Sequence, residues 1–201
     1  MPAPSEIVTH KPTRPPPGHS SFVPGKAPQR DILLVPYDPR WPATYRLLAD
    51  RVRDALGVRV LALDHIGSTA VPGLAAKPVI DLTLVVADPS EEAAWLTDLE
   101  TAGFELVVRE TWWQQHRALV HPEPRANLHV FGPDAAEPVR QRLFRDWLRT
   151  NPDDLARYQD AKLAAAEAAN AAGEHVMQYN ARKEQVIHDI YDRAFRAAGL
   201  L

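Results

Sequence analysis

Apolar residues recur along the chain with two periods, one typical of helices and one typical of strands. Between residues 41 and 57 the apolar positions lie three or four residues apart, and a glycine follows the last of them: Trp41, Tyr45, Leu48, Val52, Leu56 and Gly57. Residues at this spacing share one helical face, so the pattern predicts a helix from about residue 42 to 56. A second helix is expected at 90–102, because Ser90 suits an N-cap and Gly103 suits a helix end.

Shorter apolar runs, bounded by turn residues, predict six strands: 32–35, 59–66, 79–86, 104–109, 112–120 and 126–131. The last third of the chain is expected to be helical, with helices at 135–150, 153–172 and 178–198. Strands that alternate with helices, followed by two adjacent strands, predict an α/β (α+β) fold. We expect a mixed β-sheet packed by helices, with a helical C-terminal part on the same core.

Residues 1–30 differ in composition from the rest of the chain. Eight of the 19 prolines lie there, and apolar residues are sparse and without a period. Such a segment buries too little apolar surface to offset its ordering entropy, so we predict a disordered proline-rich tail at 1–30 and one domain at 31–201. A proline-rich motif for a protein partner is the alternative interpretation.

Composition narrows the classes of function. The 201 residues carry a formal net charge of −3, so nucleic acid is not an expected partner and phosphate binding has to be local. The absence of cysteine rules out disulfides and thiolate metal sites and agrees with a cytoplasmic location. No apolar run approaches the length of a membrane span, so no membrane partner is expected.

The segment 64–86 contains the main candidates for chemistry. Gly67, Ser68 and Thr69 follow a predicted strand, and successive N–H groups in such a turn can hold an anion. Lys77, in the crossover that follows, can neutralise a phosphate. For the turn, the alternative is a tight bend that needs a glycine for its geometry alone. For Lys77, the alternative is pairing with Asp81.

Asp81 interrupts an apolar strand. Side chains alternate along a strand, so Asp81 and Thr83 share a face. A carboxylate there needs a partner or a metal ion, because burying an unpaired charge is costly. A structural acid, held by backbone N–H groups or by Lys77, is the competing interpretation.

Three further sets of residues are weaker candidates. His129 shares a strand face with Asn127 and can act as a general base, as a metal ligand or as a structural side chain. His65 is expected to support the turn from behind, and His116 has no comparable context. Basic residues at helical spacing lie near the C-terminus, and they are usually solvated: Arg142, Arg145, Arg149, and Lys183 one turn after Tyr179.

The string His65-Ile66-Gly67-Ser68-Thr69-Ala70-Val71-Pro72-Gly73-Leu74, followed by Lys77-Pro78 and Asp81-Leu82, resembles the signature of the GrpB family. The likeness extends over about residues 32–190 and includes the segments 35–42, 128–130 and 143–149. It also includes Tyr179 with Lys183. The GrpB family is similar in fold to the nucleotidyltransferases of the polymerase-β type.

This resemblance implies a function. In those nucleotidyltransferases two carboxylates, two residues apart on one strand, hold Mg²⁺ against nucleotide phosphates. Here Asp81 matches the first, but Thr83 stands at the second position. The expected activity is Mg²⁺-assisted nucleotidyl transfer from a nucleoside triphosphate, with Asp81 and His129 as catalytic and metal-binding residues. The turn at 67–69 and Lys77 would bind phosphate.

The resemblance also implies that Lys183 closes over the nucleotide and that Tyr179 stacks on its base. The alternative is a non-catalytic nucleotide-binding or regulatory module, which the threonine at position 83 favours. The family also occurs joined to dephospho-CoA kinase, and this suggests a role related to coenzyme A.

Overall fold

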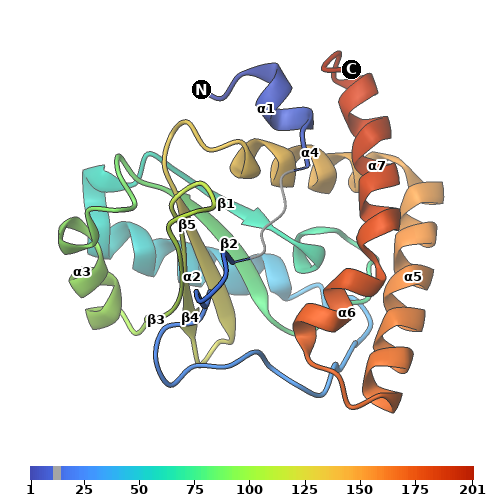
Figure 1. The fold of residues 1–201 in the computed structure, drawn as a ribbon, viewed down its shortest axis with the longest axis horizontal. Coiled ribbons are helices and arrows are strands. Elements are labelled where there is room, and N and C mark those ends of the chain that lie inside the picture. The colour runs from blue at the N-terminus through green and yellow to red at the C-terminus, as the bar shows by residue number, and fades with distance from the viewer. Residues whose placement is uncertain (11–14) are drawn as a thin grey trace.

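The computed structural model describes residues 1–10 and 15–201 and contains a five-stranded mixed sheet (Figure 1). The strands are β1 (Ala62–Ile66), β2 (Ile80–Val85), β3 (Glu105–Glu110), β4 (His116–His121) and β5 (Ala126–Phe131). Their order across the sheet is β1-β2-β5-β4-β3. The β2–β5 pair is parallel, whereas β1–β2, β4–β5 and β3–β4 are antiparallel. The predicted mixed sheet is confirmed.

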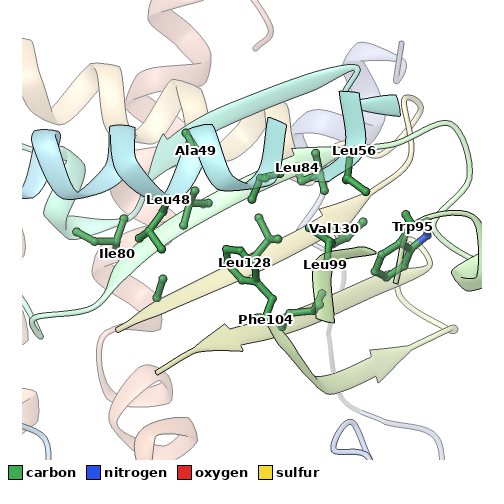
Figure 2. Close-up of a cluster of buried hydrophobic side chains, with 14 of the residues drawn as sticks. Leu48, Ala49, Leu56, Ile80, Leu84, Trp95, Leu99, Phe104, Leu128 and Val130 are labelled. Carbon is green, nitrogen blue, oxygen red and sulfur yellow. The ribbon is translucent and has the colours of Figure 1, made fainter. Parts of the chain in front are cut away.

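One face of the sheet carries the main hydrophobic core. Helix α2 (Trp41–Leu56) and the short helix α3 (Leu96–Thr101) cover this face. Figure 2 shows how their apolar side chains meet those of β2 and β5, with these residues labelled: Leu48, Ala49, Leu56, Ile80, Leu84, Trp95, Leu99, Phe104, Leu128 and Val130. Because alternate residues of β2 enter this core, Asp81 and Thr83 project from the opposite face.

The C-terminal helices lie on that opposite face (Figure 1). They are α4 (Glu137–Thr150), α5 (Pro152–Ala171), α6 (Val176–Arg182) and α7 (Glu184–Ala197). A second apolar cluster joins them to the crossover between β1 and β2: Val71, Leu74, Leu148, Tyr158 and Ile190. The crossover is therefore held between the sheet and the helices.

Four predicted elements differ from the structure. The strand at 112–120 begins only at His116, because residues 111–115 form a turn. The strand at 32–35 is reduced to one bridge between Val35 and Ala76. The helix at 90–102 is a 3₁₀ turn at 92–94 followed by α3, because Ser90 bonds to Asp88 instead of capping a helix. The helix at 178–198 is divided into α6 and α7 at Lys183, whose backbone angles are φ −107° and ψ 3°.

The described part of residues 1–30 contacts the domain, in contrast to the disorder that its composition predicts. Helix α1 (Pro4–Val8) buries Ile7 against Tyr191 and Phe195 of α7. Further along, Val23 donates its N–H to the carbonyl of Val107 at 3.1 Å. The few apolar side chains of the segment thus pack on the domain, and residues 11–14 of the predicted tail lie outside the described residues.

Over residues 1–10 and 15–201, the structure has no helix with both the length and the apolar character needed to cross a membrane.

Candidate functional site

The turn after β1 lies directly against the carboxylate of Asp81. Gly67 has φ +71°, and a Cβ built on it would overlap Asp81 Oδ2 and stand 3.0 Å from Asp81 Cβ. Glycine is the one residue that combines this backbone conformation with so close an approach. The sequence therefore needs a glycine here to bring the turn and the acid together.

The same turn presents free donors. Residues Ser68–Ala70 form one turn of 3₁₀ helix after Gly67. The N–H groups of Ser68 and Thr69, and the Ser68 hydroxyl, donate no hydrogen bond to any residue that the structure describes. Such neighbouring N–H groups can bind an anion. The Thr69 hydroxyl is different, because it is buried and lies 3.0 Å from His65 Nε2.

His65 supports this turn from the side of helix α2. Its ring stacks on Tyr45 with centroids 4.6 Å apart and planes 6° apart. Burial, aided by Arg149 and Arg145, lowers the pKa of His65 to about 4, so the ring is neutral at pH 7.

Arginines of α4 hold the turn from the other side. Arg142 pairs with Asp64 at 3.1 Å, and Arg145 donates to the carbonyl of His65 at 2.9 Å. Arg149 donates twice to the carbonyl of Ala70, at 2.8 and 3.1 Å. The expectation of a solvated arginine face is therefore wrong, since these side chains position β1 and the turn.

Asp81 is anchored by Asn127, its neighbour on β5. Asn127 Nδ2 donates to Asp81 Oδ1 at 2.8 Å. Burial raises the pKa of Asp81, and the Asn127 hydrogen bond and three lysines, Lys77, Lys183 and Lys162, oppose that rise. The carboxylate thus stands at the centre of a cationic group.

The three lysines form no ion pair within 4.0 Å with any carboxylate of residues 1–10 and 15–201. Lys162 of α5 is 2% exposed and donates to the carbonyl of Ala75 at 2.5 Å. Burial, followed by repulsion from Lys183, lowers the pKa of Lys162 to about 6. Burial also lowers the pKa of Lys77. Burial is the largest cause of both shifts, and repulsion between the lysines adds to it, so an anion bound beside them would favour their protonated forms.

Lys162 is a site residue that the sequence interpretation missed. A signal was present, because Tyr158 and Lys162 repeat the spacing of Tyr179 and Lys183. In the structure each lysine lies over the tyrosine one turn before it, at 5.4 Å for Lys162 and 4.5 Å for Lys183. Lys162 contacts the crossover through the Ala75 carbonyl, and Lys183 is close enough to Lys77 to lower its pKa.

Tyr179 is less accessible than a base-stacking role requires. It is 2% exposed, and desolvation raises the pKa of its hydroxyl. One face of the ring is covered by Lys183. Tyr179 therefore supports Lys183 at the junction of α6 and α7.

The position of the second metal-binding carboxylate is closed. Thr83 is 1% exposed, and its hydroxyl donates to Gln141 Oε1 of α4 at 2.6 Å. Within the described ranges, no three His, Asp or Glu side chains are grouped to hold a metal ion. One carboxylate surrounded by three amines does not fit a resident Mg²⁺, which prefers several oxygen ligands.

His129 lies on the same face of the sheet, opposite Thr83 in the β2–β5 register. Its Nδ1 is 2.9 Å from Nε2 of His116, and burial, together with His116, lowers the pKa of His129 to about 3. His116 was without a role in the sequence interpretation, since only the β4–β5 pairing brings the two rings together.

Most of the candidate residues border one cleft between the sheet and the C-terminal helices. The sequence candidates that line it are Gly67, Ser68, Thr69, Lys77, Asp81, His129, Tyr179 and Lys183. Lys162 and Tyr158 line it as well. The cleft can therefore offer an anion both amines and backbone donors.

Comparisons with known proteins show the family and the fold of the chain. The family model described as GrpB protein matches residues 31–193. A UPF0157 protein of Halalkalibacterium halodurans is 41% identical over 163 residues, which cover 81% of this chain and 82% of that protein. The crystal structure of conserved protein GrpB from Enterococcus faecalis has a TM-score of 0.71 and 28% identity, covering 83% of this chain and 99% of that chain.

A dephospho-CoA kinase of Mycolicibacterium paratuberculosis is also similar, with 31% identity over 190 residues. The match covers 82% of this chain but 46% of that kinase, so it spans about half of the longer protein.

Proposed function

Because this chain belongs to the GrpB family, we propose that its cleft binds a nucleotide or a similar phosphorylated small molecule. The observation that carries this proposal is the group of three unpaired lysines, Lys77, Lys162 and Lys183, around one carboxylate. A phosphate supplies the missing negative charge, and lysine is a common phosphate ligand.

The turn gives the phosphate a second set of contacts. The free N–H groups of Ser68 and Thr69 and the Ser68 hydroxyl border the same cleft as the lysines. Backbone donors fix the position of an anion, whereas lysine amines supply charge. Gly67 allows the turn to approach Asp81, so a phosphate held there lies beside the carboxylate.

We propose that the lysines, and not a protein-held Mg²⁺, neutralise most of the phosphate charge. Asp81 would meet Mg²⁺ only as part of a nucleotide complex, in which the phosphates supply most of the metal ligands. Neutralisation by lysines favours a function as a binding or regulatory module. Metal-assisted nucleotidyl transfer is the second candidate, and the specific observation in its favour is the placement of Asp81 and His129 on one face beside the glycine–serine turn.

The kinase relatives suggest which ligands to test first. Dephospho-CoA kinases of mycobacteria contain a region similar to this chain. Dephospho-coenzyme A and ATP both carry an adenosine and a chain of phosphates, so both suit a cleft that recognises phosphate. Inorganic phosphate and pyrophosphate serve as probes of the lysine cluster alone.

The experiment is a thermal-shift series with these four compounds, each in Mg²⁺ and in EDTA. We expect at least one adenosine compound to raise Tm in EDTA, since a ligand of the folded state adds RT ln(1 + [L]/Kd) to stability. Lys162→Met should remove the shift. Arg157→Met, on the same helix but paired with Asp189 at 2.8 Å, should retain it.

Two outcomes decide between the candidates. If no phosphorylated compound raises Tm in either condition, the proposed ligand class is wrong. If a shift requires Mg²⁺, and pyrophosphate release from ATP is then seen by phosphorus NMR, nucleotidyl transfer replaces the binding module as the function.

A further inference from the structure

Two buried residues stand behind His129 and connect it to a carboxylate. Glu110 Oε2 is 2.8 Å from His116 Nδ1, and His116 Nε2 is 2.9 Å from His129 Nδ1. Glu110 is 7% exposed and His116 is 5% exposed. The antiparallel pairs Glu110–His116 on β3–β4 and Ala118–His129 on β4–β5 bring these groups into one line.

The carboxylate sets the direction of both hydrogen bonds. A carboxylate only accepts hydrogen bonds, so an ionised Glu110 requires His116 Nδ1 to donate to it. If this is the one ring proton of His116, its Nε2 has the lone pair and accepts a hydrogen bond from His129 Nδ1. His129 is left with a proton on Nδ1 and a lone pair on Nε2.

The free nitrogen of His129 is directed away from this buried line. Nε2 lies across the ring from Nδ1 and forms no hydrogen bond to any residue within 1–10 and 15–201. It is also not one of the buried side-chain nitrogen and oxygen atoms of those residues that lack a hydrogen-bond partner. His129 lines the cleft. It lies on β5, next to the strand of Asp81, and two residues after Asn127, which is the hydrogen-bond partner of Asp81.

We infer that Glu110 and His116 are positioning residues, which hold His129 as the Nδ1–H tautomer with Nε2 as a hydrogen-bond acceptor facing the cleft. This inference concerns the protein without ligand and does not need the proposed function. The low pKa of His129 agrees with it, because the ring is then neutral over the physiological range.

The chemical use of this arrangement does rest on the proposed function. A hydroxyl group of a ligand bound beside Asp81 would donate a hydrogen bond to His129 Nε2 and be oriented by it. A pKa of about 3 makes the ring too weak a base to take the proton near pH 7, so the role of His129 is to position the hydroxyl group.

The test is the tautomer of His129, read from nitrogen NMR of the full chain labelled with ¹⁵N-histidine. Protonated and unprotonated ring nitrogens have well-separated shifts. The signals of His129 are identified by their loss in His129→Gln. At neutral pH and without ligand, we expect a protonated Nδ1 and an unprotonated Nε2. A protonated Nε2 in the wild-type protein would overturn the inference whatever the variants do.

The positioning role is tested by His116→Phe, which keeps a ring against Phe131, 4.7 Å away, and removes the acceptor. We expect His129 to shift toward the Nε2–H form in a protein with unchanged circular dichroism. His121→Phe replaces another buried histidine of β4, which bonds to Pro124 and Arg51, and should leave the His129 tautomer unchanged.

Glu110→Met provides a second variant, which removes the carboxylate but leaves His116 in place. We expect a mixture of His129 tautomers, since nothing then fixes the proton on His116 Nδ1. Folded His116→Phe and Glu110→Met proteins that both keep the wild-type His129 signals would show that the tautomer does not depend on this line. Ligand binding enters none of these measurements, so their failure is separate from failure of the proposed function.

Discussion

The hydroxyl of Thr83 donates a hydrogen bond to Gln141 across the contact between β2 and α4, with 2.6 Å between the two oxygens. This bond occupies the place at which the nucleotidyltransferases of similar fold carry their second metal-binding carboxylate. The position is therefore part of the packing between the sheet and a helix, and Asp81 is the one acid left on this face of β2.

Thr83→Asp should destabilise the protein, because a carboxylate there is buried and meets the Gln141 carbonyl oxygen. We expect a loss of about 3 kcal/mol in the free energy of unfolding, the size typical of a buried charge without a partner. Mg²⁺ should not restore it. Urea denaturation with and without Mg²⁺ measures both effects.

Thr83→Val is the matched control, since it keeps the shape and removes only the hydroxyl. It should cost about 1 kcal/mol for the lost hydrogen bond. A Thr83→Asp protein that is as stable as wild type and gains stability with Mg²⁺ would instead reveal an open metal site.

The contact between Gly67 and Asp81 leads to a second prediction. Gly67→Ala should lower stability by more than the roughly 1–2 kcal/mol that a left-handed backbone costs an L-residue, because its Cβ also overlaps the Asp81 carboxylate. It should also weaken the binding of any phosphorylated ligand. Gly73 separates the two effects, since it has φ +83° but open space around its Cβ position.

Gly73→Ala should therefore show the backbone cost alone and leave binding intact. Calorimetric titration and urea denaturation of both variants provide the measurement. Equal losses at the two glycines would mean that the turn yields at Asp81 and that the close approach has no role.

The arrangement of Asp81 and Thr83 could be predicted from the sequence, because strands alternate and the apolar residues of β2 had to enter the core. The mixed sheet was predicted for the same kind of reason, and it is confirmed. The spacing of apolar residues within one segment is sufficient for such conclusions, because it shows which face of a strand or helix is buried. The family resemblance rested instead on the signature at residues 65–82, and the family model confirms it.

Long-range contacts could not be predicted in this way. Helix α5 is so rich in alanine that its sequence does not indicate which face is buried, and Lys162 was therefore missed. The His116–His129 contact depends on the register between β4 and β5, which no local pattern specifies. The arginines of α4 were taken as solvated because their partners lie about 80 residues away: the Asp64 carboxylate for Arg142 and backbone carbonyls for Arg145 and Arg149.

The N-terminal segment gives a third prediction. Ile7 is 7% exposed and packs in a cluster with Ala136, Tyr191 and Phe195. Ile7→Ala should lower the free energy of unfolding by about 2 kcal/mol, the lower end of the range for a large apolar side chain cut to alanine in a core. A chain that starts at residue 11 should lose at least as much. Unchanged urea midpoints for both would support the disordered tail that the composition predicts.

The fourth prediction concerns Lys162 and the dependence of stability on pH. The pKa of its amine is about 6 in the folded protein and ordinarily 10.5. Between these values the unfolded chain carries a proton on Lys162 that the folded chain lacks. Unfolding therefore takes up a proton, and stability must rise with pH across this window.

Lys162→Met removes this proton and keeps a side chain of similar length. The wild-type free energy of unfolding, minus that of Lys162→Met, should increase from pH 6 to pH 9, with a slope below about 1.4 kcal/mol per pH unit. Taking the difference cancels the groups that titrate in both proteins. Parallel pH profiles of the two proteins would show that Lys162 keeps an ordinary pKa and that the lysine cluster is well balanced.

A bound phosphate should reverse the effect of burial on Lys162. Its negative charge favours the protonated amine, so binding above pH 6 has to take up a proton from the buffer. Titration calorimetry in buffers of different ionisation enthalpy measures this uptake. Any phosphate binding that Lys162→Met retains should occur without the uptake of this proton. Arg157→Met, which alters a charge on the same helix without a titrating amine, should take up as much as wild type. Phosphate binding without proton uptake in the wild-type protein would place the anion away from Lys162, at the turn of Ser68 alone.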